Sequence, residues 1–200
     1  MANYVLVHGG DRDGSLWDSV KILLEKQGHR VFCPSMSSIK TTTLQENVNE
    51  VVQYIQSHNL ESFILVGHSY GGFVVTGVTN TIPNQVDILI YVDSLLPKNG
   101  KSLYDIVTID YASQDPACDQ SDKAVVSKLN FDTKTVFSRK KAYIHCLKSE
   151  FFELTKFTYQ EIKDAQDDWL IFCLDTTHSP MLTHPKELAV ILLGCADLLT

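Results

Sequence analysis

Short, almost continuously apolar runs alternate with longer amphipathic stretches through much of this sequence. The first such runs cover residues 4–7, 30–33 and 63–66, and amphipathic stretches at 16–27 and 44–58 separate them. Runs of Val, Ile and Leu without strict alternation are typical of strands that helices cover on both faces in a parallel sheet. The pattern continues with an expected helix at 70–80, apolar runs at 86–92, 142–146 and 170–174, and a last helix at 185–199. We therefore predict an open, mostly parallel, doubly wound α/β sheet.

The 200 residues match one domain, and we expect residues 1–200 to share a single core. The pattern is interrupted at 98–140, where Lys98-Asn99-Gly100 opens a polar stretch rich in Asp, Ser, Lys and Gln. This stretch is too short for a core of its own, but it could form two short helices over the strand ends. We interpret 98–140 as a short cap, or lid, inserted into the domain.

The charge of the chain narrows the range of partners. With 17 basic and 24 acidic residues the formal net charge is −7, which argues against nucleic acid or anionic membranes as partners and favours a neutral substrate. The start of the sequence lacks the features of a secretory signal, and no apolar run approaches the roughly 18 residues that span a membrane. Five cysteines, an odd number without CxxC pairing, indicate buried free thiols. These features predict a soluble, cytoplasmic protein.

The sequence Gly67-His68-Ser69-Tyr70-Gly71 follows one predicted strand and opens a predicted helix. In this G-x-S-x-G pattern, the glycines permit a turn so tight that the serine adopts strained backbone angles and its hydroxyl stands above the sheet. The N-terminus of the following helix supplies free N–H groups where negative charge would develop. The alternative is a chance match in an ordinary strand-to-helix turn. We predict Ser69 as a nucleophile.

A glycine-containing loop, His8-Gly9-Gly10, directly follows the first predicted strand. In hydrolases with the G-x-S-x-G turn, one oxyanion donor is the N–H of the residue after the nucleophile and the other comes from an early loop. These positions correspond to Tyr70 and Gly10. An ordinary glycine-rich turn is the alternative, whereas the spacing of Gly9, Gly10 and Gly14 excludes the G-x-G-x-x-G dinucleotide loop.

His178 follows the last predicted strand, at the position from which a base can reach back to the serine. A single histidine is more often structural than catalytic, so position must decide. We expect His145 in the core or facing the lid, and His68 pointing away from the reacting groups. The remaining histidines lie near helix ends, turns or the predicted oxyanion loop: His8, His29, His58 and His184.

Six segments together resemble the plant methylesterase and hydroxynitrile lyase group of α/β-hydrolases and its bacterial esterase relatives. The resemblance covers most of the chain and implies a Ser-His-Asp site under a helical cap, with no metal or organic cofactor. It assigns the same roles to Ser69, His178, Gly10 and Tyr70. The segments are residues 5–10, Trp17, and residues 66–72, 91–97, 143–146 and 178–182.

The chain departs from this family in its cap, which is shorter than in the plant members, and in the acid of the triad. Ser149 occupies the position at which the family carries its acid, and a serine cannot hold a negative charge beside an imidazole. We rank the adjacent Glu150 first as the substitute. Asp93 is the competitor, because it ends the preceding strand, although it could instead bind loop N–H groups. Asp175 is too close to His178 in sequence to orient it.

These features predict a serine hydrolase that acts on small carboxylic esters through an acyl-enzyme. Gly9, Trp17 and Leu182 are expected around the substrate pocket, although Trp17 and Leu182 could equally belong to the core. A hydroxynitrile lyase is a second interpretation. Lyases of this group carry a lysine directly after the catalytic histidine, and the presence of Ser179 at that position argues against lyase activity. A third is a binding protein on a hydrolase scaffold that does not turn its ligand over. An apolar face of the lid could pair two subunits in a homodimer.

Overall fold

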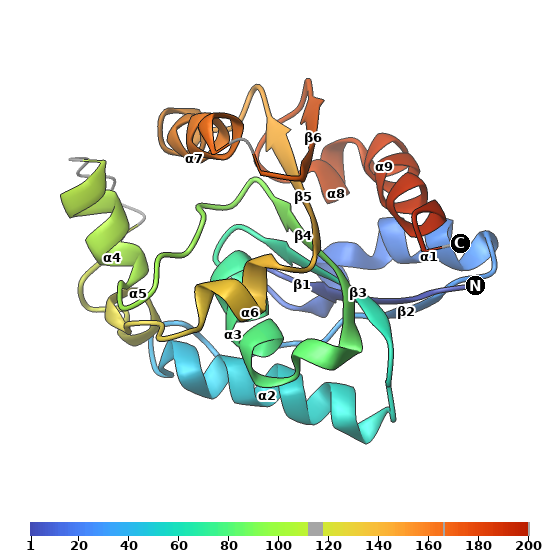
Figure 1. Ribbon diagram of the computed structural model, residues 1–200, viewed down its shortest axis with the longest axis horizontal. Helices are drawn as coiled ribbons and strands as arrows, with labels where there is room; N and C mark the ends of the chain where they lie inside the picture. The colour runs from blue at the N-terminus through green and yellow to red at the C-terminus, as the bar shows by residue number, and fades with distance from the viewer. Residues whose placement is uncertain (112–117, 166, 200) are drawn as a thin grey trace.

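The computed structural model describes residues 1–111, 118–165 and 167–199 and shows one six-stranded sheet, in which every neighbouring pair of strands is parallel (Figure 1). The spatial order is β2-β1-β3-β4-β5-β6. The doubly wound α/β fold predicted from the apolar runs is confirmed. The strands are β1 (Asn3–Val7), β2 (Arg30–Phe32), β3 (Phe63–His68), β4 (Val86–Val92), β5 (Lys140–Cys146) and β6 (Trp169–Leu174).

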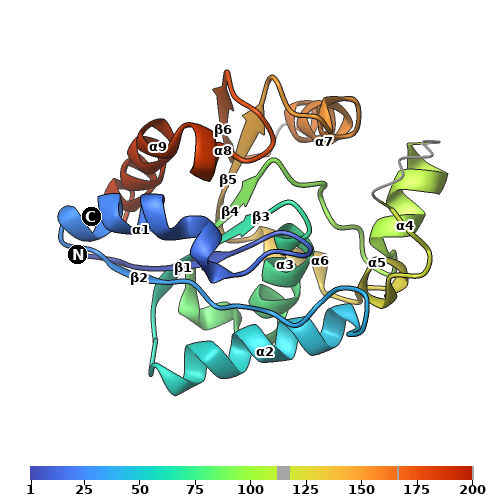
Figure 2. The same cartoon turned by 180° about the vertical axis from the view of Figure 1, so that it is seen from behind.

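Helices cover both faces of the sheet, as Figures 1 and 2 show from opposite sides. Alternate residues of β1 enter two different cores: Val5 and Val7 pack on the side of α2 and α3, whereas Tyr4 and Leu6 pack on the side of α1 and α9. Burial on both faces explains why the strands are apolar throughout. The long helices are α1 (Asp18–Lys26), α2 (Leu44–Ser57), α3 (Gly71–Thr81), α7 (Phe152–Asp164) and α9 (Pro185–Asp197).

Helix α7 was not predicted from the sequence. Its buried face combines Leu154 and Ile162 with two threonines, Thr155 and Thr158, so the apolar periodicity that identifies an amphipathic helix is diluted. The hydroxyl of Thr158 accepts a hydrogen bond from the N–H of Leu96 at 3.2 Å, which ties α7 to the chain leaving β4. The polar residues on this face therefore hold the helix in place beside the strand ends.

The described residues between β4 and β5 include three short helices, α4 (Leu103–Asp105), α5 (Lys123–Val126) and α6 (Thr133–Phe137), and a π-helical turn (Ile106–Asp110) follows α4. This is the stretch in which the sequence predicts two short helices of a cap. Residues 112–117, which belong to the predicted cap, lie outside the described residues.

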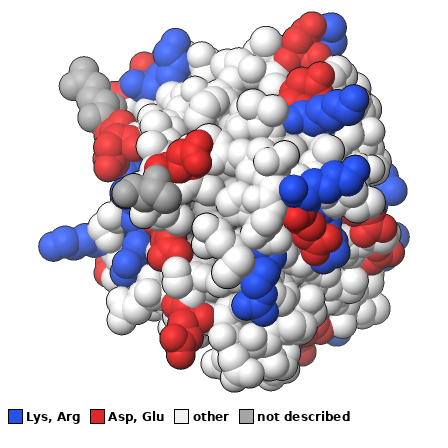
Figure 3. All heavy atoms as spheres, turned by 90° about the vertical axis from the view of Figure 1, so that its right-hand side faces the viewer, with Lys and Arg blue, Asp and Glu red and all other residues white. Residues whose placement is uncertain are grey.

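The surface beside α1 and α9 shows no concentration of one charge. Figure 3 views the molecule from the right-hand side of Figure 1 and shows acidic and basic side chains interspersed around a broad uncharged area. None of the helices in the described part of the chain is long and apolar enough to cross a membrane.

Candidate active site

Ser69 lies in the turn between β3 and α3, and its backbone φ of +53° is in the left-handed region. A non-glycine residue there costs about 1–3 kcal/mol, which the surrounding structure must hold in place. The Ser69 N–H donates to the carbonyl oxygen of Val92 at 3.1 Å. A Cβ at Gly67 would lie 2.6 Å from the carbonyl oxygen of Gly71, so only glycine permits this close approach. The turn therefore has the strained geometry that the G-x-S-x-G pattern predicts.

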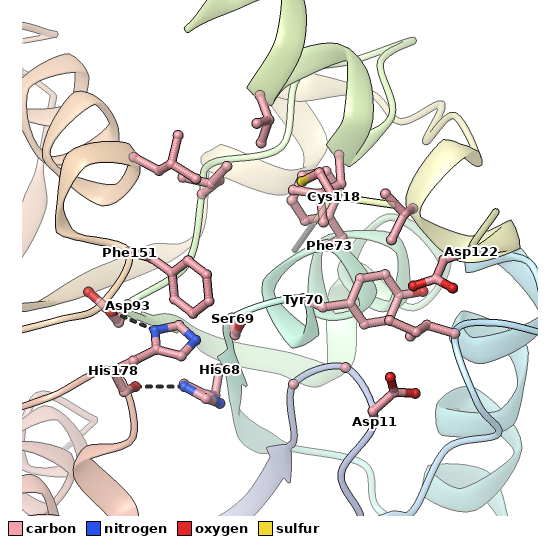
Figure 4. Close-up of a pocket in the computed structure, with 18 of the residues that line it drawn as sticks. Asp11, His68, Ser69, Tyr70, Phe73, Asp93, Cys118, Asp122, Phe151 and His178 are labelled. Carbon is pink, nitrogen blue, oxygen red and sulfur yellow. Dashed lines mark hydrogen bonds and ion pairs between the residues drawn. The ribbon is translucent and has the colours of Figure 1, made fainter. Parts of the chain in front are cut away.

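The ring of His178 faces a carboxylate. Its Nδ1 lies 2.7 Å from Oδ2 of Asp93, which directly follows β4 and has a φ of +44° (Figure 4). The Asp93 side chain is fully buried. It also accepts hydrogen bonds from the Ser149 hydroxyl and, at 3.1 Å, from the N–H of Cys146. Three donors thus surround the Asp93 carboxylate, and one of them is the imidazole.

Glu150, which the sequence analysis ranked first as the acid, contacts a different part of His178. Its carboxylate accepts a hydrogen bond from the backbone N–H of His178 at 3.0 Å, and backbone hydrogen bonds of this kind hold its pKa below the usual range. The geometry therefore favours the competitor, Asp93, as the partner of the ring. Ser149, at the family's acid position, supports this carboxylate through its hydroxyl.

His68 contacts His178 from the other side. Its Nε2 lies 2.8 Å from the carbonyl oxygen of His178, and complete burial lowers its pKa to about 3, so the ring is neutral and Nε2–H is the donor. Both backbone groups of His178 are thus held in place, the N–H by Glu150 and the carbonyl oxygen by His68. The prediction that His68 points away from the reacting groups is therefore wrong: its ring centroid lies 4.6 Å from that of His178, and it lines the same cavity. Nothing in a linear pattern relates position 68 to position 178.

The loop after β1 packs directly against the serine turn. A Cβ at Gly9 would lie 3.1 Å from Cβ of Ser69. Nε2 of His8 accepts the N–H of Met36 at 3.0 Å, so Nδ1–H donates to the carbonyl oxygen of Gly9 at 2.7 Å, and burial lowers the pKa of this histidine. His8 therefore fixes the loop as a neutral side chain.

Both predicted oxyanion donors, Gly10 and Tyr70, line the same cavity as Ser69 and His178. Neither backbone N–H donates to a group elsewhere in the described residues. The Tyr70 side chain is anchored by a hydrogen bond of 2.9 Å from its hydroxyl to Oδ1 of Asn47. Two free N–H groups beside a serine hydroxyl are what an oxyanion hole requires.

The cavity has a volume of about 520 Å³, and Figure 4 shows Ser69 near its centre with His178 to one side. Gly9 lines this cavity, whereas two other residues expected around the substrate pocket do not. Trp17 is fully buried in the core of α1 and α9, where it packs edge-on against His68, and Leu182 is 55% exposed on α8 (Pro180–Thr183). The apolar walls are instead formed by Ile39, Phe73, Leu95, Leu103, Val107, Val125, Phe151 and Leu154.

No group of three or more His, Cys, Asp or Glu side chains that could hold a metal ion occurs within residues 1–111, 118–165 and 167–199. The groups that the site does bring together are a hydroxyl, an imidazole, a carboxylate and two free N–H donors. These can perform nucleophilic attack, proton transfer and stabilisation of an oxyanion.

The sequence of the chain is similar to those of known hydrolases and esterases. The sequence profile of the alpha/beta hydrolase family matches residues 4–117. A carbendazim hydrolyzing esterase of Nocardioides sp. is 38% identical over 111 residues, which cover 52% of this chain and 46% of the esterase. Methylesterase 8 of Arabidopsis thaliana is 32% identical over 109 residues, covering 50% of this chain and 40% of the relative. The match thus spans about half the length of these curated relatives.

Solved structures extend the similarity of fold to nearly the whole chain. A pyrethroid hydrolase from Sphingobium faniae JZ-2 has a TM-score of 0.79 at 18% identity, with 98% of this chain and 97% of the hydrolase covered. An extracellular alpha/beta-hydrolase from a Paenibacillus species has a TM-score of 0.77 at 19% identity, with 97% and 98% covered.

Proposed function

The chain belongs to the alpha/beta hydrolase family, and from that premise we propose that it is a serine hydrolase of small carboxylic esters. Ser69 is the nucleophile, His178 the base and Asp93 the acid. The N–H groups of Gly10 and Tyr70 bind the oxyanion. The observation that carries the proposal is the contact of 2.7 Å between His178 Nδ1 and Asp93 Oδ2 in the cavity that Ser69 lines.

The chemistry follows from the tautomer that Asp93 selects. With Nδ1–H donating to the carboxylate, Nε2 of His178 is left to take the proton of the Ser69 hydroxyl as its oxygen attacks the ester carbonyl. The tetrahedral oxyanion is stabilised by Gly10 and Tyr70, and its collapse expels the alcohol, which receives the proton from Nε2. Water, activated by the same nitrogen, then attacks the acyl-enzyme and releases the acid and free Ser69.

The relatives support ester hydrolysis as the reaction class, since two of them carry the names esterase and methylesterase. The apolar walls of the cavity suit the body of an aromatic or aliphatic ester. No disulfide joins the cysteines of the described residues, which supports a reducing compartment such as the cytoplasm.

Labelling by a fluorophosphonate probe tests the proposal, because such a probe reacts with an activated serine. We expect the wild type to be labelled and to hydrolyse p-nitrophenyl acetate, and both signals to be lost in Ser69→Ala and His178→Ala. Ser127→Ala, which removes a half-buried hydroxyl of the predicted cap that donates to the carbonyl oxygen of Lys123, is the control. Folded wild-type protein that is neither labelled nor active would contradict the proposal and favour a binding role.

A further inference from the structure

Asp122 is a buried carboxylate on the wall of the cavity for which the proposed reaction has no use. Its residue exposure is 8%, so it is more than nine-tenths buried. It immediately precedes α5, where an aspartate ordinarily caps the helix by accepting a backbone N–H. Here the N–H of Val125 donates instead to the carbonyl oxygen of Asp122, at 3.0 Å, and the carboxylate caps nothing.

Other helices of the same segment show the usual arrangement. The Asp132 carboxylate caps α6 by accepting the N–H groups of Lys134 and Thr135, and the Ser102 hydroxyl caps α4. Asp122 differs from both, since nothing in the described part of the chain donates a hydrogen bond or pairs a charge with its carboxylate. In Figure 4 it lies beyond Tyr70, on the side of the cavity away from His178.

The other charged residues of the cavity do not neutralise Asp122. Lys40 lies 3.8 Å from the Asp11 carboxylate, and Asp119 accepts the N–H of Ser121. With Arg12 included, the cavity wall at this end carries two basic and three acidic side chains. The carboxylate oxygens of Asp122 are not fully enclosed by protein, so they are open to the cavity that the residue lines. A cation bound there would pair with an otherwise unpaired charge.

We propose that Asp122 binds a protonated amine of the substrate, so that the preferred esters carry an ammonium group separated from the ester carbonyl by an apolar body. This specificity rests on the proposed esterase function. Ser69 lies near the centre of the cavity and Asp122 beyond Tyr70, with the apolar side chains of Phe73, Leu103 and Val125 among the walls. The sequence favours a neutral substrate, whereas the local charge at this end favours a cationic one.

Methyl 3-arylpropanoates that differ only at the para position test this proposal, with para substituents of aminomethyl, hydroxymethyl or methyl. Because a hydrogen bond to a charged group is roughly twice as strong as a neutral one, we expect kcat/KM of the aminomethyl ester to exceed that of the methyl ester by about tenfold or more. Asp122→Asn keeps the shape and one acceptor oxygen but removes the charge, so the preference should fall to about threefold or less.

Asp18→Asn is the matched control, because it removes the charge of an exposed carboxylate on α1 that does not line the cavity. It should keep the wild-type preference for the aminomethyl ester within about twofold. An aminomethyl ester no better than the methyl ester in the wild type, or a preference that survives in Asp122→Asn, would overturn the proposal.

A binding measurement separates this inference from the esterase proposal. Calorimetry with 4-phenylbutylammonium and the Ser69→Ala protein needs no turnover, and we expect binding that Asp122→Asn weakens by about tenfold. If the wild type hydrolyses none of these esters but this binding is observed, the proposed esterase reaction is wrong and the proposed amine site is supported. No difference in binding between the Ser69→Ala protein and its Asp122→Asn derivative would refute the amine site.

Discussion

Two carboxylates contact His178, and they contact different parts of it. Asp93 binds the ring nitrogen Nδ1 and is buried, whereas Glu150 binds the backbone N–H. A catalytic acid must stabilise the imidazolium and select the tautomer, which requires contact with the ring. Glu150 and His68 hold the peptide groups of His178, so we regard them as positioning residues.

Replacing each carboxylate by its amide distinguishes these roles. Asp93→Asn should lower kcat for p-nitrophenyl acetate by about ten-thousand-fold, because an amide can donate to Nδ1 and so favour the wrong tautomer. Glu150→Gln keeps an oxygen acceptor for the His178 N–H and should cost about tenfold or less. The opposite order, with Glu150→Gln the more damaging change, would make Glu150 the acid.

At the level of elements, the start of α3 is pressed against β1 and the loop that follows it. A Cβ at Gly71 would lie 2.6 Å from the carbonyl oxygen of His8 and 2.8 Å from that of Val7. Both are backbone atoms, which cannot rotate away as the end of a side chain could. The close approach brings the serine turn and the predicted oxyanion loop together, so the position of this helix sets the geometry of the site.

The substitution Gly71→Ala should therefore be strongly destabilising. We expect the free energy of unfolding to fall by about 3 kcal/mol and esterase activity to be lost, since the helix must move away from β1. Gly194→Ala is the control, because Gly194 is exposed in α9 and its Cβ would meet nothing within 4 Å. Alanine there should stabilise the protein by about 0.5–1 kcal/mol. Urea unfolding measures both, and equal effects at the two sites would contradict this packing argument.

On the scale of the whole molecule, the sequence was sufficient to predict those features that depend on a residue's neighbours along the chain. The doubly wound fold and the strained turn at Ser69 follow from local patterns, apolar runs in one case and glycine spacing in the other. The partner of His178 could not be predicted with certainty, because Asp93 and Glu150 follow two different strands and only their relative placement decides between them. Trp17 was misplaced for the same reason, since the pattern of a helix does not say which face of the sheet it covers.

Acid should destabilise the whole molecule before its carboxylates titrate, because buried histidines must stay neutral for it to fold. The pKa of His68 is about 3 in the folded state against an ordinary value of 6.5, so the unfolded chain binds the proton more readily. The stabilisation is complete above pH 6.5 and is lost as the pH falls toward 3, at about 1.4 kcal/mol per pH unit.

His68→Gln removes this titration and should reduce the loss in unfolding free energy between pH 6.5 and 5 by about 2 kcal/mol in urea titrations. His58→Gln, at the exposed end of α2, is the control. A pH dependence identical in His68→Gln and the wild type would show that His68 is already accessible to protons in the folded state.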